Sequence, residues 1–424
     1  MLPKRLIVRL ALLPIVISAC SGASLSNERI AGEGTLPEET SSGATEREQR
    51  NEERGTPPSN ESGGDPGAPA VDTKELDAFV EGQLEATPAI PGISLALVKG
   101  GKVVAARAYG LADRERNAPM KTDTILEVAS ISKTFTGVAL MQLVAEGKVS
   151  LGADISTYLG RTIKNPRFAA PITTKMLLTH TSSILGNDQA LDSLFQPDAD
   201  SPMPLSELSA QFLVQGGRYY TTQTYSTSAP GSQWAYCNVC LGVVGHLVER
   251  VAGTSLSAHT KEKIFTPLGM TSTSWLLADT DRARLVTPYS VDPRTGQAER
   301  VPHFGLPDWP AGSLKTTALD LARFAAELSS DGTKILPKTE LDEMLKVHFA
   351  AGTRNPDQGL TFMKDKVAGR EVWGHNGALP GIASVYSFVR SQGLGVVVLA
   401  NTDVEVADPA LRAIETKSYE VLSR

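Results

Sequence analysis

Ser130-Ile131-Ser132-Lys133 opens an apolar segment with helical periodicity, and this S-x-x-K run dominates what the sequence predicts. A serine hydroxyl is a weak nucleophile until a nearby base removes its proton. Residues three apart share one face of a helix, so Ser130 and Lys133 are expected to meet there. The apolar positions continue to Gly147, which suits the C-terminal end of a helix. The stretch therefore predicts a nucleophile and its base at the start of a buried helix.

Two further short motifs follow along the chain, namely Tyr236-Cys237-Asn238 and His375-Asn376-Gly377. Each motif alone is weak. Their occurrence in this order, after an S-x-x-K at the start of a helix, predicts a serine hydrolase that works by acyl transfer.

The folded region is predicted to begin at residue 73, where the composition becomes globular. Strand patterns lie near both ends of it, at 93–98, 103–108, 383–389 and 395–400. Helical patterns are clearest at 73–84, 173–178, 239–251 and 408–422. This order predicts an α+β fold. One antiparallel sheet would form from the N- and C-terminal segments and be flanked by helices. A mainly helical subdomain would be inserted at about 150–310.

The N-terminal residues 1–19 are predicted to be a lipoprotein signal peptide. Three basic residues precede the short apolar run 10–17, which is too brief to span a bilayer comfortably. Small residues then lead to Cys20, as in bacterial lipoprotein signals, so we expect Cys20 to be lipidated. The alternative is an ordinary cleaved signal in which the cysteine is incidental.

Residues 20–72 are rich in Gly, Ser, Glu, Pro and Thr, a composition that cannot bury enough apolar surface to fold alone. They are predicted to form a disordered linker between a lipid anchor and the domain at 73–424. The expected location is the bacterial cell envelope, with the membrane as a partner through the lipid. Ser21 favours the outer membrane, facing the periplasm, in a Gram-negative host.

The overall charge disfavours nucleic acid as a partner, because the net charge is −6 and no basic stripe occurs. The six histidines show no metal-binding spacing, so the sequence predicts neither a metal nor another cofactor. Cys237 and Cys240 form a C-x-x-C pair without a thioredoxin-like pattern around it. We interpret them as two small reduced residues, and a disulfide remains the alternative.

With these motifs the chain resembles the serine β-lactamase and penicillin-binding-protein superfamily over residues 73–424. The resemblance is to the branch that contains class C β-lactamases, esterases, D,D-peptidases and D-aminopeptidases. Further runs that carry it are Leu177-Leu178-Thr179-His180-Thr181-Ser182, Pro267-Leu268-Gly269-Met270, Ala311-Gly312-Ser313-Leu314 and Gly381.

The resemblance implies a role for each motif. Ser130 would be the nucleophile, Lys133 its proton acceptor or electrostatic activator, and Tyr236 the group that passes the proton to the leaving group. The implied substrate-binding positions are Asn238, His375, Gly377 and Ala378. Of these, Asn238 would also orient Lys133. The backbone N–H groups of Ser130 and Ala378 would form an oxyanion hole.

The sequence departs from typical β-lactamases at His375, where they carry a lysine, and at Ser183, where a glycine is usual. A neutral imidazole holds a substrate carboxylate less well than an ammonium group. We therefore expect a D-amino-acid peptide or a carboxylic ester as substrate, drawn from small molecules or peptidoglycan. The alternatives are a β-lactamase and a non-catalytic lipoprotein that binds cell-wall fragments. His180 is expected to stabilise a loop, and Lys315-Thr316-Thr317 is rejected as a K-T-G motif because it lacks the glycine.

Overall fold

The computed structural model describes residues 64–65, 67–330, 334–350, 352 and 356–424. The predicted signal peptide 1–19, Cys20 and most of the linker 20–72 lie outside the described residues. Where the described chain begins, the Asp65 N–H donates to the Val103 carbonyl oxygen (2.9 Å). The chain therefore contacts the domain before residue 73, whereas the composition had placed the start of the domain at residue 73.

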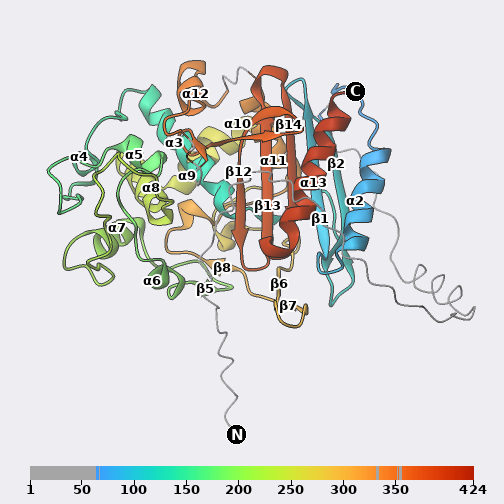
Figure 1. Cartoon of the computed structure of the whole chain (residues 1–424), viewed down its shortest axis with the longest axis horizontal. Helices are drawn as coiled ribbons and strands as arrows, with labels where there is room; N and C mark the ends of the chain where they lie inside the picture. Colours follow the sequence, from blue (N-terminus) through green and yellow to red (C-terminus); the bar gives the residue numbers. More distant parts are fainter. Residues whose placement is uncertain (1–63, 66, 331–333, 351, 353–355) are drawn as a thin grey trace, which may run out of the picture.

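The centre of the fold is an eight-stranded sheet in the order β10-β11-β12-β13-β14-β1-β2-β3, with every pair antiparallel. The C-terminal strands lie beside the N-terminal ones, as the colours of Figure 1 show. The strands are β1 (Gly92–Lys99), β2 (Lys102–Asp113), β3 (Ala118–Pro119), β10 (Asp357–Gln358), β11 (Met363–Val367), β12 (Arg370–Leu379), β13 (Ile382–Val389) and β14 (Leu394–Ala400). The predicted sheet built from both ends of the chain is confirmed.

Strand β1 shows why the two ends meet. Its residues from Gly92 to Val98 are buried on both faces, as expected of a continuous apolar run in the middle of a sheet. It pairs with β14 from Ile93 opposite Ala400 to Val98 opposite Gly395. The hairpin to β2 turns at Gly100 and Gly101, whose φ angles of 61° and 68° suit glycine in a two-residue turn.

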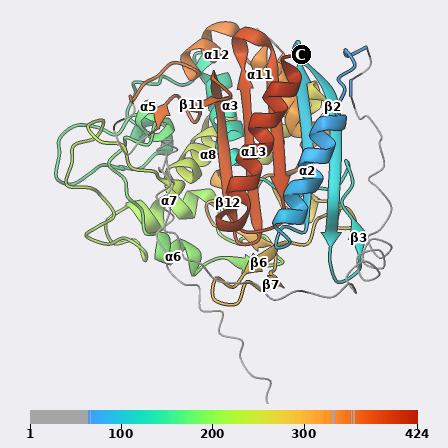
Figure 2. The ribbon, with the colours of Figure 1, turned by 45° about the vertical axis from the view of Figure 1, so that its right-hand side comes forward.

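Helices cover both faces of this sheet. On one face α2 (Lys74–Ala86) and α13 (Val404–Leu422) lie side by side (Figure 2) and bury apolar side chains such as Leu76 and Ile414. Against the other face lies α11 (Ala318–Ser329), with α3 (Ser132–Ala145) and α8 (Asn238–Ala252) in the same apolar core. The catalytic motifs therefore lie where the sheet meets this second layer.

The inserted region is mainly helical, as predicted. Its helices are α4 (Ser156–Leu159), α5 (Thr174–Leu178), α6 (Asp188–Asp192), α7 (Leu205–Leu213), α9 (Leu256–Thr260) and α10 (Thr266–Leu268). Its short strands form the pairs β5 (Gln196–Pro197) with β8 (Phe304–Gly305) and β6 (Tyr289–Val291) with β7 (Ala298–Arg300). Helices α4, α5, α7 and α8 of this region lie at the left of Figure 1, and its strands β6 and β7 lie below the sheet. Helix α12 (Lys338–Met344) follows α11, and β4 (Leu126–Glu127) pairs with β9 (Lys315–Thr316) beside the nucleophile.

Two predicted helix starts are wrong. The helix expected from Ser130 begins at Ser132, after a 3-10 turn at Ala129–Ile131. The final helix, expected from about 408, begins at Val404 and contains Pro409 in its second turn. The earlier turn forms because the Asp403 carboxylate is fixed by the Ser290 hydroxyl and two backbone N–H groups, and because Ala407 packs in the core.

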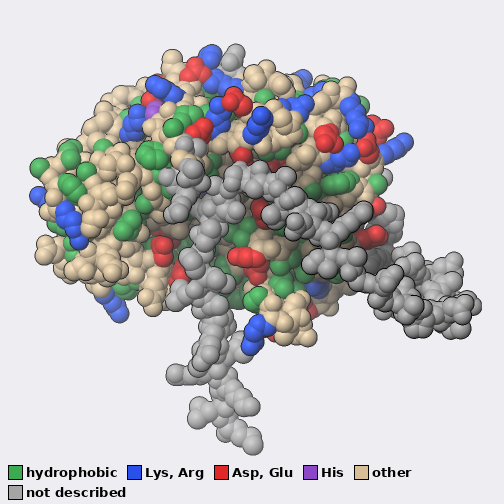
Figure 3. Space-filling view, viewed as in Figure 1, with side chains coloured by type: hydrophobic (Ala, Val, Ile, Leu, Met, Phe, Trp, Pro, Cys, Tyr) green, Lys and Arg blue, Asp and Glu red, His purple; other side chains and the backbone are tan. Residues whose placement is uncertain are grey.

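On the face shown in Figure 3, basic and acidic side chains are interspersed over the surface that remains visible. Among the described residues, no single helix is long and apolar enough to cross a membrane. The bent pair of segments Asn238–Ala252 and Leu256–Leu268 passes that test only when the two are taken together.

Candidate active site

The turn that carries Ser130 is held against the sheet by a close approach of two backbones. A Cβ atom on Gly377 of β12 would lie 2.4 Å from the Val128 carbonyl oxygen, so this position needs glycine. The Ser384 hydroxyl of the neighbouring strand donates to the same oxygen (3.0 Å). Ala129 takes a φ of +46°, unusual for alanine, and turns the chain into α3. Gly377, predicted to bind substrate, thus also has a packing role that places the turn with Ser130.

Lys133 reaches back from α3 to the Ser130 hydroxyl. Its Nζ donates to Ser130 Oγ (2.9 Å) and to the Ala311 carbonyl oxygen (2.7 Å). The start of α3 is fixed to the segment around Ala311 by Thr136, whose hydroxyl donates to the Pro310 carbonyl oxygen, and by Ser132, whose hydroxyl accepts from Leu314 N–H. The S-x-x-K pair therefore meets as predicted.

The surroundings of Lys133 favour its neutral amine. The residue is fully buried, and burial lowers the pKa of its amine because an ammonium group loses its hydration. Asp308 and Asp188 favour the charged form and reduce this pKa shift without reversing it. Burial in turn raises the pKa of the Asp308 carboxyl. An amine that gives up its proton easily, 2.9 Å from a hydroxyl, can act as a general base.

Tyr236 completes a compact group around Ser130. It precedes α8, its phenol lies close enough to Ser130 for the serine to lower its pKa, and its ring centroid lies 4.9 Å from Lys133 Nζ. Burial raises the pKa of the Tyr236 phenol, so the group keeps its proton at neutral pH. A neutral phenol in contact with the nucleophile is suited to donate a proton to a departing group.

His375 lies on β12 with its ring 6.3 Å from that of Tyr236. Its Nδ1–H donates to the Asn376 carbonyl oxygen (2.5 Å). Burial, with the nearby charge of Lys133, lowers the pKa of His375 to about 3, so the imidazole is neutral across the physiological range. This edge of the site therefore carries a polar group without charge.

The hydrogen bonds of Lys133 differ from the prediction for Asn238, whereas the oxyanion-hole role of Ala378 stays a prediction. Asn238 is the first residue of α8, but the hydrogen bonds of Lys133 in the described structure go to Ser130 and Ala311, so Asn238 does not orient the lysine. The lysine is held instead by a backbone carbonyl, which no side-chain motif marks in a sequence. Ala378 follows Gly377 on β12, beside the Ser130 turn.

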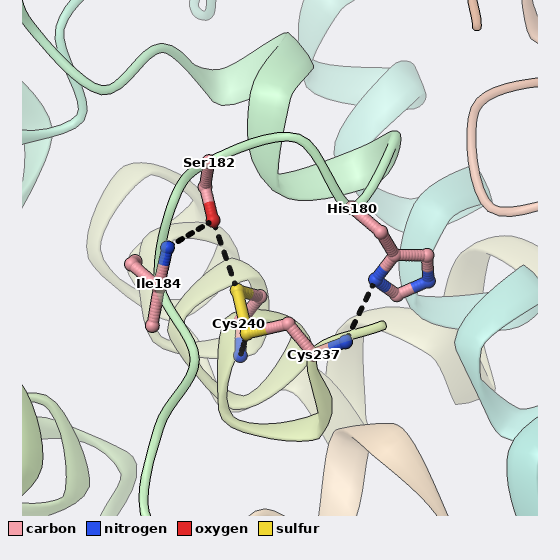
Figure 4. The surroundings of a disulfide bond; sticks show 5 residues. All are labelled: His180, Ser182, Ile184, Cys237 and Cys240. Carbon is pink, nitrogen blue, oxygen red and sulfur yellow. Dashed lines mark hydrogen bonds between the residues drawn. A yellow bond between two sulfur atoms is a disulfide. The ribbon is translucent and has the colours of Figure 1, made fainter. Parts of the chain in front are cut away.

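Cys237 and Cys240 form a disulfide at the start of α8 (Figure 4). This corrects their interpretation as two reduced residues. Cys237 is the extended residue before the helix and Cys240 lies in its first turn, so their Cα atoms are only 5.3 Å apart, within the range that a disulfide spans. The bond thus closes a loop one residue after Tyr236.

A second buried charge cluster lies just before Ser130, and no pattern in the sequence predicted it. Lys315 Nζ is 3.6 Å from the Glu127 carboxylate, and His303 Nδ1 is 3.2 Å from the same group. Lys315 Nζ also donates to the Ser313 and Trp275 carbonyl oxygens. Lys315, which we did not assign to a K-T-G motif, thus fastens β9 to β4 at Glu127, which lies three residues before Ser130.

Within the described residues, no three His, Cys, Asp or Glu side chains gather as metal ligands.

Comparison with known proteins places this geometry in a family. The family model described as Beta-lactamase matches residues 76–419. Esterase EstB of Burkholderia gladioli is 28% identical over 381 residues, which cover 81% of this chain and 94% of the esterase. Protein flp of Staphylococcus aureus (strain MRSA252) is 24% identical over 81% of this chain, which spans only 66% of that protein's length.

The fold also matches a solved structure, that of D-amino acid amidase from Ochrobactrum anthropi SV3 complexed with L-phenylalanine amide. The TM-score is 0.66 at 24% identity, and the match covers 82% of this chain and 99% of the amidase. At 24% identity this match shows a shared fold and not a shared activity.

Proposed function

This chain belongs to the Beta-lactamase family of serine hydrolases, and on that premise we propose that it hydrolyses carboxylic esters or D-amino-acid amides and peptides through an acyl-enzyme on Ser130. Ser130 Oγ bonds to the substrate carbonyl carbon while its proton passes to the neutral amine of Lys133. The bond to the leaving group then breaks as Tyr236 gives that group a proton and recovers one from Lys133. Water attacks the acyl-enzyme, and the acid product and Ser130 are released.

The observation that carries the proposal is the contact between Lys133 Nζ and Ser130 Oγ at 2.9 Å. The lysine side chain in this contact is fully buried. A serine becomes nucleophilic only with such a base at hydrogen-bond distance. The phenol of Tyr236 on the same oxygen supplies the acid for the second half of the reaction.

The charges around the site favour a substrate without a carboxylate at the reacting end. His375 is neutral, and the carboxyl groups of Asp188 and Asp308 lie within electrostatic range of Lys133. An anionic β-lactam would find no fixed positive charge at His375, where β-lactamases of the resembled family carry lysine. The 28% identity to a protein named as an esterase also supports esters over β-lactams as substrates.

A substrate panel tests the proposal on the full-length protein. We expect turnover of a p-nitrophenyl ester or a D-amino-acid amide above that of nitrocefin and of a D-Ala-D-Ala peptide, and loss of all turnover in Ser130→Ala. Nitrocefin hydrolysed far faster than the other substrates would make the protein a β-lactamase instead. The absence of turnover and of fluorophosphonate labelling would favour a non-catalytic binding protein.

We further propose that Cys20 carries a lipid and anchors the domain to a membrane of the bacterial envelope. The support is the small-residue run that ends at Cys20 after a short apolar stretch. Metabolic labelling with an alkyne fatty acid should mark the wild type and not Cys20→Ala. Equal labelling of the two proteins would refute the anchor.

A further inference from the structure

His180 holds the backbone on both sides of Tyr236. Its carbonyl oxygen accepts from Ala235 N–H (2.8 Å), and its Nδ1 accepts from Cys237 N–H (3.2 Å), as Figure 4 shows for the second contact. Its ring lies against the Tyr236 ring with centroids 4.5 Å apart. One side chain and its own carbonyl therefore contact three consecutive residues centred on the tyrosine.

The contact with Cys237 defines the state of the imidazole. Because Nδ1 accepts a hydrogen bond, the proton of the neutral ring is assigned to Nε2. Burial, with the nearby Lys133, lowers the pKa of His180 well below its usual value, which keeps Nδ1 free to accept. The groups that act electrostatically on this ring are Lys133 and His375, so it faces the reaction centre. Among the described residues, Nε2 has no hydrogen-bond partner, so the side chain is fixed by the Nδ1 contact, the tilted ring of Tyr236 and an edge contact with the Trp234 ring.

The backbone of His180 is strained to reach this position. Its φ of +56° lies in the left-handed region, which non-glycine residues seldom adopt and which Asn, Asp and His tolerate best. Such conformations persist where the surroundings enforce them, and they cluster at functional sites. A residue needed only to fill space in a loop would not require this backbone.

We propose that His180 is a positioning residue that aims the Tyr236 phenol at Ser130 and at the leaving group. The inference rests on the proposed function, in which Tyr236 delivers the proton that the departing group needs. Tyr236 lies in the extended chain before α8. This chain is tied to the loop of His180 by two backbone hydrogen bonds, from Gly231 N–H to the Thr181 carbonyl oxygen and from Ala235 N–H to the His180 carbonyl oxygen. Without the Nδ1 contact, the peptide after Tyr236 is released and the phenol can swing away from Ser130.

Two esters of the same acid with different leaving groups distinguish a positioning role of His180 from an effect on protein stability. A p-nitrophenolate departs without a proton, whereas an alkoxide from an alkyl ester requires one. A displaced Tyr236 therefore slows the alkyl ester far more than the p-nitrophenyl ester. Loss of folded protein slows both substrates equally. Because kcat/KM reports the acylation step, the deacylation step that both esters share does not affect the ratio of their kcat/KM values.

The test uses His180→Asn and His180→Gln in the full-length protein. The Asn oxygen can occupy the place of Nδ1 and Asn tolerates the left-handed backbone, whereas Gln puts its amide near the place of Nε2. His259→Asn, which alters a buried histidine bonded to Gln142 away from the site, is the matched control.

For His180→Gln we expect kcat/KM to fall about 100-fold on the alkyl ester and about tenfold or less on the p-nitrophenyl ester. His180→Asn should recover most of the alkyl-ester rate, and His259→Asn should resemble the wild type on both esters. Equal losses on both esters, or equal rates for the Asn and Gln variants, would overturn the positioning role. A wild type inactive on both esters would instead refute the proposed function, so the two failures are distinguishable.

Discussion

Among the described residues two lysines are fully buried, Lys133, which contacts Ala311 at the start of the Ala311–Lys315 segment, and Lys315, which ends it. We expect their surroundings to give them opposite uses. Lys315 lies near a carboxylate, Glu127, at 3.6 Å, and donates to two carbonyl oxygens. Lys133 has no carboxylate in contact and touches a hydroxyl instead. Burial lowers the pKa of both amines. Because the Glu127 carboxylate lies 3.6 Å from Lys315, whereas Asp308 and Asp188 act on Lys133 without an ion-pair contact, we expect Lys315 to serve as a structural cation and Lys133 as a base.

The largest expected effect is that of Lys133→Met, which should lower activity without lowering stability. Lys133→Met should lower kcat/KM on every accepted substrate by about a thousandfold, since the base is lost. The free energy of unfolding should stay the same or rise, because a buried amine without a contacting carboxylate is replaced by an apolar chain of similar length. Ester kinetics and urea unfolding of the same preparation measure both quantities. An active variant would remove Lys133 from the mechanism.

The reverse pattern is expected at Lys315. Lys315→Met should cost about 3–5 kcal/mol of unfolding free energy, because Glu127 loses a buried positive partner. Adding Glu127→Gln should recover part of that loss. As a control, Lys148→Met, at an exposed ion pair with Glu146, should cost less than about 1 kcal/mol. An unchanged stability of Lys315→Met would contradict a structural role for this lysine.

A smaller effect is expected at His375. His375→Lys should raise the ratio of nitrocefin to ester kcat/KM about tenfold, by supplying a charge for the β-lactam carboxylate. His375→Gln, which stays neutral, should leave the ratio near that of the wild type. If the lysine variant gives no gain over the glutamine variant, the neutral imidazole does not set the substrate preference.

A further expected effect is on the pH dependence of stability. The pKa of Lys133 is lower in the folded than in the unfolded protein, so the unfolded state binds more protons between the two values. The penalty of the charged, buried lysine is complete below the folded pKa and disappears as pH rises to the unfolded value. Urea unfolding from pH 6 to 10 should therefore show wild type gaining stability relative to Lys133→Met. A constant difference would mean that the lysine pKa is not shifted.

The parts of this site that the sequence predicted are those carried by side-chain spacing. Ser130 and Lys133 are three residues apart, and the helix brings them together whatever surrounds it. The sheet from both chain ends was predicted for a similar reason, because strands such as β1 and β14 show runs of buried apolar residues.

The remainder depended on tertiary contacts that leave no local pattern. The carbonyl oxygen of Ala311, the charges of Asp188 and Asp308, and the Glu127–Lys315 pair come from segments far apart in the chain. Asn238 was assigned to Lys133 through a resemblance, and the lysine is held elsewhere in this protein. His180 was expected to stabilise a loop, and the structure shows which residues it contacts.

Intact-mass spectrometry of the full-length protein after brief exposure to a slowly hydrolysed ester tests the central claim, that Ser130 is acylated with Lys133 as its base. The account predicts an adduct of the acyl group's mass on the wild type, mapped by peptide digestion to Ser130. The adduct should be absent from Ser130→Ala and should form about a thousandfold more slowly in Lys133→Met. An adduct of equal yield on Ser130→Ala, or one mapped to another residue, would contradict the account.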